Sequence, residues 1–321
     1  MKRRAALGAA LATVVLVAGV RADTVNEPAA ATAVAVRVTP PPGPMIGGCR
    51  VFPNDNAWNV NIRNAPLLVN STRMIAYIQA HGSDNLHPDF GQNQSYGIPF
   101  VIVPQNQPLV PIRFDAYGDE SDPGPYPVPL NAPVEAGSDG HVLVLRQGTC
   151  DLFELGVARR SGGGWLATVG ARFDLRSNAL RPLTWTSADA AGLPILPGLV
   201  RHDEVAAGHI DHAIRVTFGV TRRGFVLPAT HFASSTTSLD APAMGQRLRL
   251  KASYDISGLT GQARVIAEAM KNYGLIVADN GSNWYFQGAP DPGWVDADLN
   301  QLKGIPGTAF EAVDMGPVRT S

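Results

Sequence analysis

The stretch that decides the fold is "HVLVLRQGTCDLFELGVARRSGGGWLATVGARFDL" (residues 141–175). It contains three short apolar segments, 141–145, 151–158 and 165–175, which are separated by glycine-containing turns. Short apolar runs bounded by turn residues are typical of β-strands, whereas helices need ten or more periodic residues. The stretch therefore predicts three strands in a row.

The rest of the chain extends this pattern. Further strands are predicted at 98–104, which reads as a central buried strand, and at 111–118, 212–218, 224–229 and 247–256. Residues 275–286 predict a hairpin about Asn280-Gly281. Helical patterns occur at 70–82 and 261–274, without a repeat or helix–strand alternation. With 33 glycines and 26 prolines to form turns, the sequence predicts a mostly β protein, a β-sandwich or jelly roll with a few peripheral helices.

The N-terminus has the features of a signal peptide. Basic residues 2–4 precede an apolar run at 5–20, and small residues allow cleavage after Ala22. The run is shorter than the roughly 20 residues that cross a bilayer. We therefore expect a secreted or periplasmic protein without a membrane span after cleavage. Residues 23–48, rich in alanine and proline, predict a disordered leader, and residues 49–321 a single β-rich domain.

Two cysteines, Cys49 and Cys150, are the only ones in the chain. In an oxidising compartment an isolated pair forms a disulfide, and neither cysteine lies in a catalytic motif. The net charge of −1 gives no reason to expect a nucleic acid partner. The chain has no P-loop, G-x-S-x-G, H-E-x-x-H or C-x-x-C motif, and we expect no cofactor. A Ser/His/Asp site stays open, because its members can lie far apart in sequence.

Three of the seven histidines lie in "RHDEVAAGHIDHAIRVTF" (residues 201–218). Strand alternation sends His209 and His212 to opposite faces, which argues against an H-x-x-H metal site. His212 lies on the apolar face, where a carboxylate partner is expected, either as a core histidine or as an acid–base group. His141, which opens a strand, is the second candidate. A metal-dependent enzyme using His141, His212 and His231 remains an alternative.

Two carboxylates are candidates for acid–base chemistry. Glu154 lies in the middle of the strand at 151–158, where it faces solvent or lines a cleft that would raise its pKa. Asp174 ends the strand at 165–175 beside Arg172 and Arg176, so it serves either as a partner carboxylate or in an ion pair.

A substrate-binding surface is indicated by cations and aromatic residues. Arg247, Arg249 and Lys251 alternate with apolar residues and form a row along one strand face. Such a row either keeps an outer face soluble or binds carboxylates or sulfates of a chain-like substrate. Trp185 lies in a long loop and Trp284 follows a turn. Tryptophans in such positions either stack on sugars or pack on the core.

At "DGHVLVL", "FDLRSNALRP" and "ADNGSNWYFQGAPDPGW" the chain resembles a widespread group of exported bacterial proteins described as hypothetical. The resemblance spans about Cys49 to Val313. It implies one exported domain, and it brings no activity, cofactor or catalytic residue with it.

These observations lead to three hypotheses about function. The first is a secreted enzyme that acts on a polysaccharide, possibly acidic. As a hydrolase it would use Glu154 as general acid with Asp174, and as a lyase it would use His212 or His141 as base, with the basic row neutralising a uronate. The second is a non-catalytic glycan-binding or cell-envelope protein, and the third is the metal-dependent enzyme. In the first two the partner is an extracellular glycan.

Overall fold

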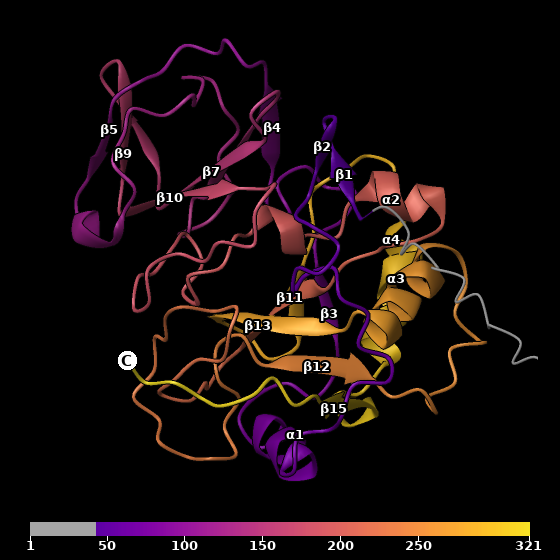
Figure 1. The fold of residues 1–321 in the computed structure, drawn as a ribbon. Helices are drawn as coiled ribbons and strands as arrows, with labels where there is room; N and C mark the ends of the chain where they lie inside the picture. The colour runs from indigo at the N-terminus through magenta and orange to yellow at the C-terminus, as the bar shows by residue number, and fades with distance from the viewer. Residues whose placement is uncertain (1–42) are drawn as a thin grey trace, which may run out of the picture. The chain divides into compact units, whose positions relative to one another are not determined.

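The strands of this computed structural model, which describes residues 43–321, form four sheets (Figure 1). The predicted signal peptide and residues 23–42 of the predicted leader lie outside the described residues. Helices are fewer than strands, so the prediction of a mostly β protein is confirmed. The described residues belong to one unit, Pro40–Ser321. Met45 and Ile46 were assigned to the leader, but they form β1 (Met45–Ile46), which pairs with β2 (Cys49–Arg50).

The stretch at 141–175 builds most of a four-stranded sheet. Its strands, in order across the sheet, are β10 (Val169–Asp174), β7 (Asp151–Gly156), β6 (Val142–Arg146) and β4 (Phe100–Val103). β6, β7 and β10 pair antiparallel, and β4 joins β6 in parallel. The prediction that 98–104 forms a central buried strand is wrong, because β4 is an edge strand and Ile102 is 37% exposed.

A three-stranded sheet shares a core with one face of the four-stranded sheet. It consists of β5 (Ile112–Phe114), β9 (Gly164–Ala167) and β8 (Arg159–Ser161). Val144 and Phe153 of the four-stranded sheet pack in this core together with Trp165 of β9. The other face of the four-stranded sheet carries Leu143 and Ala171, which belong to the larger core of the molecule. Both faces of β7 are therefore buried.

The largest sheet is mixed and has six strands. In order these are β15 (Phe310–Ala312), β12 (Arg247–Leu250), β13 (Leu275–Asn280), β11 (Ile214–Phe218), β14 (Tyr285–Gln287) and β3 (His87–Asp89). The predicted hairpin about Asn280-Gly281 is wrong, because β11 lies between β13 and β14. β11 pairs in parallel with β13 and antiparallel with β14. The turn about Asn280-Gly281 therefore connects β13 to β14 across the end of β11.

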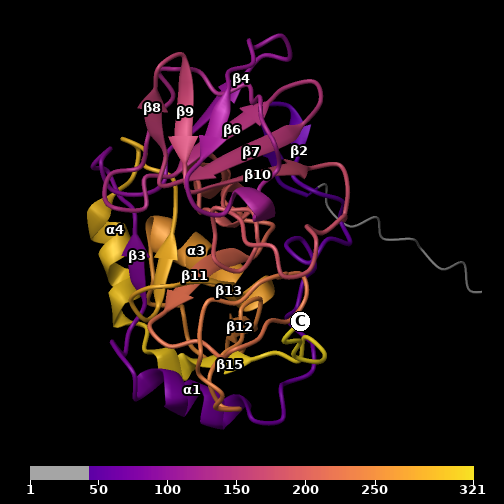
Figure 2. The same ribbon diagram turned by 90° about the vertical axis from the view of Figure 1, so that its left-hand side faces the viewer.

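In the described part of the chain, four α-helices lie around the six-stranded sheet. They are α1 (Ser71–Gln79), α2 (His202–Ala207), α3 (Gly261–Asn272) and α4 (Asp296–Gln301). Figure 2 shows α1 next to β15, and α3 packs against α4 and β12. The helices predicted at 70–82 and 261–274 correspond to α1 and α3. α2 and α4 were not predicted, since each has only six residues and one fully buried apolar side chain.

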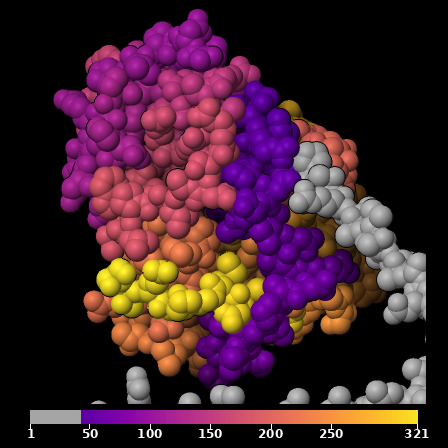
Figure 3. All heavy atoms as spheres, in the orientation of Figure 1, coloured from indigo at the N-terminus to yellow at the C-terminus, as the bar shows by residue number. Residues whose placement is uncertain are grey.

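Two predicted strands are shorter or absent in the structure. Residues 224–229 form only isolated bridges at Phe225, in keeping with the proline at 228, which lacks a backbone donor. The strand predicted at 247–256 ends at Leu250 and gives way to a turn. In Figure 3 the C-terminal segment (yellow) crosses the surface beside N-terminal residues (indigo). Leu67 and Val313 form an isolated antiparallel bridge. None of the helices described in residues 43–321 is long and apolar enough to cross a membrane.

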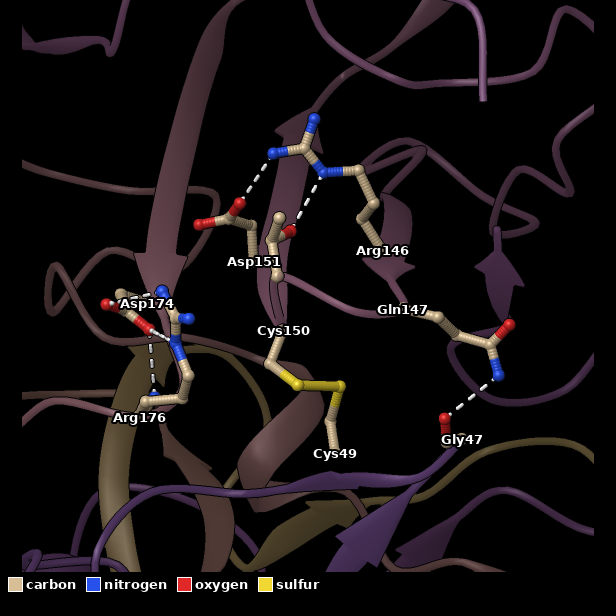
Figure 4. The surroundings of a disulfide bond; sticks show 9 residues. Gly47, Cys49, Arg146, Gln147, Cys150, Asp151, Asp174 and Arg176 are labelled. Atoms are coloured by element: carbon tan, nitrogen blue, oxygen red, sulfur yellow. Dashed lines mark hydrogen bonds and ion pairs between the residues drawn. A yellow bond between two sulfur atoms is a disulfide. The ribbon is translucent and has the colours of Figure 1, made fainter. Parts of the chain in front are cut away.

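The predicted disulfide is confirmed. Cys49 and Cys150 are joined with an S–S distance of 2.09 Å and a sequence separation of 101 residues (Figure 4). The bond ties β2 to the residue that precedes β7. It therefore fastens the first described segment of the chain to the four-stranded sheet.

Candidate functional site

Glu154 lies in the interior of the molecule and not in a cleft. Its exposure is 0%, and its carboxylate accepts hydrogen bonds from the backbone N–H groups of Ile195 and Leu196 at 2.9–3.0 Å. Leu196 begins a short 3₁₀ helix, Leu196–Gly198. Burial raises the pKa of Glu154 to about 7, although the two N–H groups oppose this shift. The expectation of a solvent-facing or cleft-lining glutamate is therefore wrong, and its carboxylate serves to anchor the 195–198 segment.

Asp174 does not join Glu154. It pairs with Asp151 across the sheet, whereas Glu154 pairs with Ala171, so the two carboxylates belong to opposite faces. The carboxylate of Asp174 accepts hydrogen bonds from the backbone and side chain of Arg176 (Figure 4). These bonds lower the pKa of Asp174, with a smaller contribution from the charge of Arg176. The ion-pair interpretation of Asp174 fits the structure.

The two candidate histidines, His141 and His212, lie in separate buried positions. The ring of His141 contacts the carboxylate of Glu135 through Nδ1 and the carbonyl oxygen of Ala188 through Nε2. Both partners are acceptors, so both nitrogens are satisfied only in the imidazolium form. Burial lowers the pKa of His141, but the hydrogen bond and charge of Glu135 outweigh it and raise the pKa overall.

His212 is fully buried, where partial burial was expected, and it has the expected carboxylate partner. Its Nε2 lies 3.0 Å from Glu204 and its Nδ1 lies 2.8 Å from the carbonyl oxygen of Ala213. His209 is exposed and lies 3.0 Å from Asp211, and the segment before β11 is helix α2 and a loop, not a strand. Within residues 43–321 no group of three His, Cys, Asp or Glu side chains could hold a metal ion.

The side chains of the basic row donate to backbone carbonyl groups, and the two arginines do not face solvent. Arg247 and Arg249 are buried, and they donate to carbonyl oxygens of the segment 57–65. Arg249 also pairs with Glu311 at 2.8 Å. Lys251 follows the end of β12 and donates to the carbonyl oxygen of Thr308 at 2.8 Å. The shared face of the two arginines was predicted correctly, but that face packs against another segment of the chain.

The two predicted tryptophans do not form an exposed platform. Trp284 is fully buried, packs against Phe218 and Phe310, and donates from Nε1 to Gln79 at 2.8 Å. Trp185 is half-buried, and the guanidinium of Arg181 lies over its ring. Tyr285, the first residue of β14, has different partners from Trp284, since its ring stacks on His87.

A buried ion pair between the sheets was not predicted from the sequence. Arg215 of β11 makes a bidentate contact with Asp189 at 2.5 and 3.0 Å, and both side chains are buried. Asp279, at the end of β13, accepts from the backbone N–H of Ala190. Burial and the negative charge of Asp189 raise the pKa of Asp279 to about 7. With Glu154 and His141, this cluster joins the four-stranded and six-stranded sheets.

The candidate binding site lies at the surface where β3 and β14 pair. The rings of His87 and Tyr285 are stacked with centroids 4.1 Å apart and planes at 8°, and both side chains are half-buried. Tyr96 is 37% exposed, and its hydroxyl lies 3.2 Å from His87 Nε2 and donates to the carbonyl oxygen of Pro88. We call His87, Tyr96 and Tyr285 the aromatic site.

A polar cavity adjoins the aromatic site. Its volume is about 250 Å³, and it is bordered by Tyr96 and by Asn93, Asp296, Asn300 and Lys303, all of which are exposed. Asp296 accepts a hydrogen bond from the backbone N–H of Gln92, which fixes this wall. Amide, carboxylate, ammonium and phenol groups thus line one hollow beside stacked rings.

His87 and Tyr96 of the aromatic site are uncharged at neutral pH. Burial and the positive charge of Lys303 lower the pKa of His87, against the opposing effect of Asp89. Burial and the nearby carboxylate of Asp89 raise the pKa of Tyr96 above its usual range. A neutral imidazole and a phenol can each donate and accept hydrogen bonds, as ligand hydroxyl groups require.

One signal in the sequence could have located this site. The aromatic pair Trp284-Tyr285 directly after the Asn280-Gly281 turn marks the start of β14, and a tyrosine at a strand start is a candidate for a partly exposed ring. No signal identifies His87, since β3 has only three residues and contains a proline, which is typical of an edge strand. No family model matches the chain, and no curated protein or solved structure matches it.

Proposed function

We propose that the protein is a non-catalytic glycan-binding protein, secreted or periplasmic, which binds saccharides at the aromatic site. The observation that carries the proposal is the His87–Tyr285 stack beside a polar cavity of about 250 Å³. Aromatic rings offer rigid apolar surface at a low entropy cost, and neighbouring polar groups can fix the orientation of a ligand. The disulfide and the predicted signal peptide support an extracytoplasmic location.

The charges of the site favour a neutral saccharide. The cavity carries one ammonium group, Lys303, and one carboxylate, Asp296, and Asp89 lies on the face of β3 that bears His87. An acidic glycan would need an excess of cations, and the row that was expected to supply them is occupied with backbone carbonyl groups. We therefore expect binding to neutral chains to exceed binding to uronates.

The enzymatic alternative is less well supported. A general acid must reach the glycosidic oxygen within hydrogen-bond distance, but Glu154 is 0% exposed and Asp174 lies on the other face of the sheet. His141 and His212 are buried as well, and their ring nitrogens are occupied. The finer fold class, a β-sandwich or jelly roll, also remains a proposal, supported by the core that two of the sheets share.

The test uses purified protein and a panel of neutral and acidic polysaccharides. Binding is measured by affinity electrophoresis, while reducing ends and ultraviolet absorbance of unsaturated uronates are followed over a day. The proposal predicts saturable retardation by at least one neutral chain with no rise in either product signal. Production of new reducing ends, or binding to no member of the panel, would overturn it.

A further inference from the structure

A second cavity lies on another part of the surface, between α1 and β15. Its volume is about 530 Å³, within the range of ligand pockets. The walls are mainly apolar, with Leu67, Leu68, Ile75 and Phe310 among them. We call this cavity the α1 groove.

Apolar side chains are unusually exposed at the mouth of the α1 groove. Val69 is fully exposed and Leu67 is 45% exposed. Leu239, from another loop, is 66% exposed and lies nearby, because its carbonyl oxygen accepts a hydrogen bond from Asn70. Exposed apolar residues gathered around a cavity are typical of binding surfaces rather than of ordinary solvent-facing loops.

The α1 groove also contains one cation without a carboxylate partner. Lys251 lines it and uses its ammonium group to donate to the carbonyl oxygen of Thr308, which is another lining residue. Within residues 43–321, Lys251 takes part in no ion pair. The one carboxylate in the lining, Glu311, is already paired with Arg249 at 2.8 Å. The apolar walls therefore lead to the ammonium group of Lys251, which can donate further hydrogen bonds.

We propose that the α1 groove binds a free single-chain alkyl carboxylate, with its chain along Leu67, Ile75 and Phe310 and its carboxylate on Lys251. Each methylene group that enters the groove removes further apolar surface from water, so affinity increases with chain length. The ammonium group gives the carboxylate a charge-assisted hydrogen bond, which a neutral or cationic head group lacks. This inference is independent of the glycan-binding proposal, since it uses none of the same residues.

The experiment is isothermal titration of the purified protein with laurate, and with dodecyltrimethylammonium as the head-group control, both below their critical micelle concentrations. The inference predicts one saturable site for laurate and at least tenfold weaker binding of the cation. Lys251→Gln is expected to weaken laurate at least tenfold. Ala76→Trp, at an exposed position that lines the groove, is expected to abolish it.

The matched control is Lys303→Gln, an exposed lysine at the other cavity. It is expected to leave laurate affinity unchanged, whereas Lys251→Gln is expected to leave glycan binding unchanged. Equal binding of laurate and the ammonium surfactant, an unchanged affinity in Lys251→Gln, or no saturable site would overturn the inference. A concentration-dependent dimer that Ala76→Trp abolishes would also overturn it, because a second copy of the chain would then occupy the groove.

Discussion

Glu154 and Asp174 lie on neighbouring strands of one sheet and project from its opposite faces. The register fixes this relationship, because Glu154 is opposite Ala171 while Asp174 is opposite Asp151. Glu154 points into the larger core, and Asp174 points to the surface and pairs with Arg176. A mechanism that needs both carboxylates on one substrate is not available in this arrangement.

The buried carboxylate predicts how stability changes with pH. The pKa of Glu154 is about 7 in the folded protein and near 4.5 in the unfolded chain. The folded state therefore holds the proton of Glu154 more tightly than the unfolded chain does. The contribution of this proton to the free energy of unfolding is fully present below pH 4.5 and is lost as pH rises to 7. Linkage gives a change of about 3 kcal/mol over this window.

Glu154→Gln keeps a carbonyl acceptor for Ile195 and Leu196 but cannot ionise. Relative to the natural protein, the variant should gain stability as pH rises from 5 to 8, measured by urea denaturation at both values. Asp174→Asn is the control, and it should show no such gain. An equal difference between Glu154→Gln and the natural protein at both pH values would contradict the assigned burial.

The ion pair between Asp189 and Arg215 predicts a large effect on stability. Arg215→Met leaves a fully buried carboxylate without its partner, which should lower the free energy of unfolding by about 3–5 kcal/mol. Arg176→Met removes an exposed partner of Asp174 and should leave stability nearly unchanged. Similar urea midpoints for the two variants would show that the pair is not buried as described.

The disulfide predicts a further loss of stability when it is removed. It closes a loop of about 100 residues, and Cys49→Ala together with Cys150→Ala should lower the free energy of unfolding by about 2–5 kcal/mol. Adding a reducing agent should lower the stability of the natural protein to the same level, and should not affect the double variant. A double variant as stable as the natural protein would contradict this.

His87 predicts a pH limit for glycan binding. Burial and the charge of Lys303 lower the pKa of His87 from the usual value of 6.5, so most of the fall in affinity should come below pH 6.5, as the ring becomes charged. His87→Phe keeps the stack on Tyr285 but cannot titrate, and its affinity should not vary with pH. The same acid-induced fall in both proteins would exclude His87 as the titrating group.

The sequence could predict local structure well. Apolar runs bounded by turns located β6, β7 and β11, and helical periodicity located α1 and α3. The single strand predicted at 165–175 is divided in the structure between β9 and β10, which belong to different sheets. The disulfide followed from the cysteine count. Carboxylate contact and burial of His212 were also expected, because alternation placed its side chain on the apolar face.

Burial and the order of strands could not be predicted in the same way. The period of two in a strand says which residues share a face, but not whether that face meets solvent or another part of the chain. Arg247 and Arg249 share one face of their strand as expected, but residues 57–65 cover that face. In the same way, residues 195–196 cover the carboxylate of Glu154. Likewise, β11 separates β13 from β14 through a long-range pairing that no local signal encodes.

The most direct test of the glycan-binding proposal compares two tyrosine variants by isothermal titration with the neutral polysaccharide that the panel identifies. Tyr285→Ala removes half of the stack on His87, and Tyr117→Ala removes an exposed tyrosine that precedes the 3₁₀ helix Gly118–Glu120, outside the aromatic site. The proposal predicts at least tenfold weaker binding, about 1.4 kcal/mol, for Tyr285→Ala and unchanged binding for Tyr117→Ala. Equal affinities of both variants and the natural protein would contradict it.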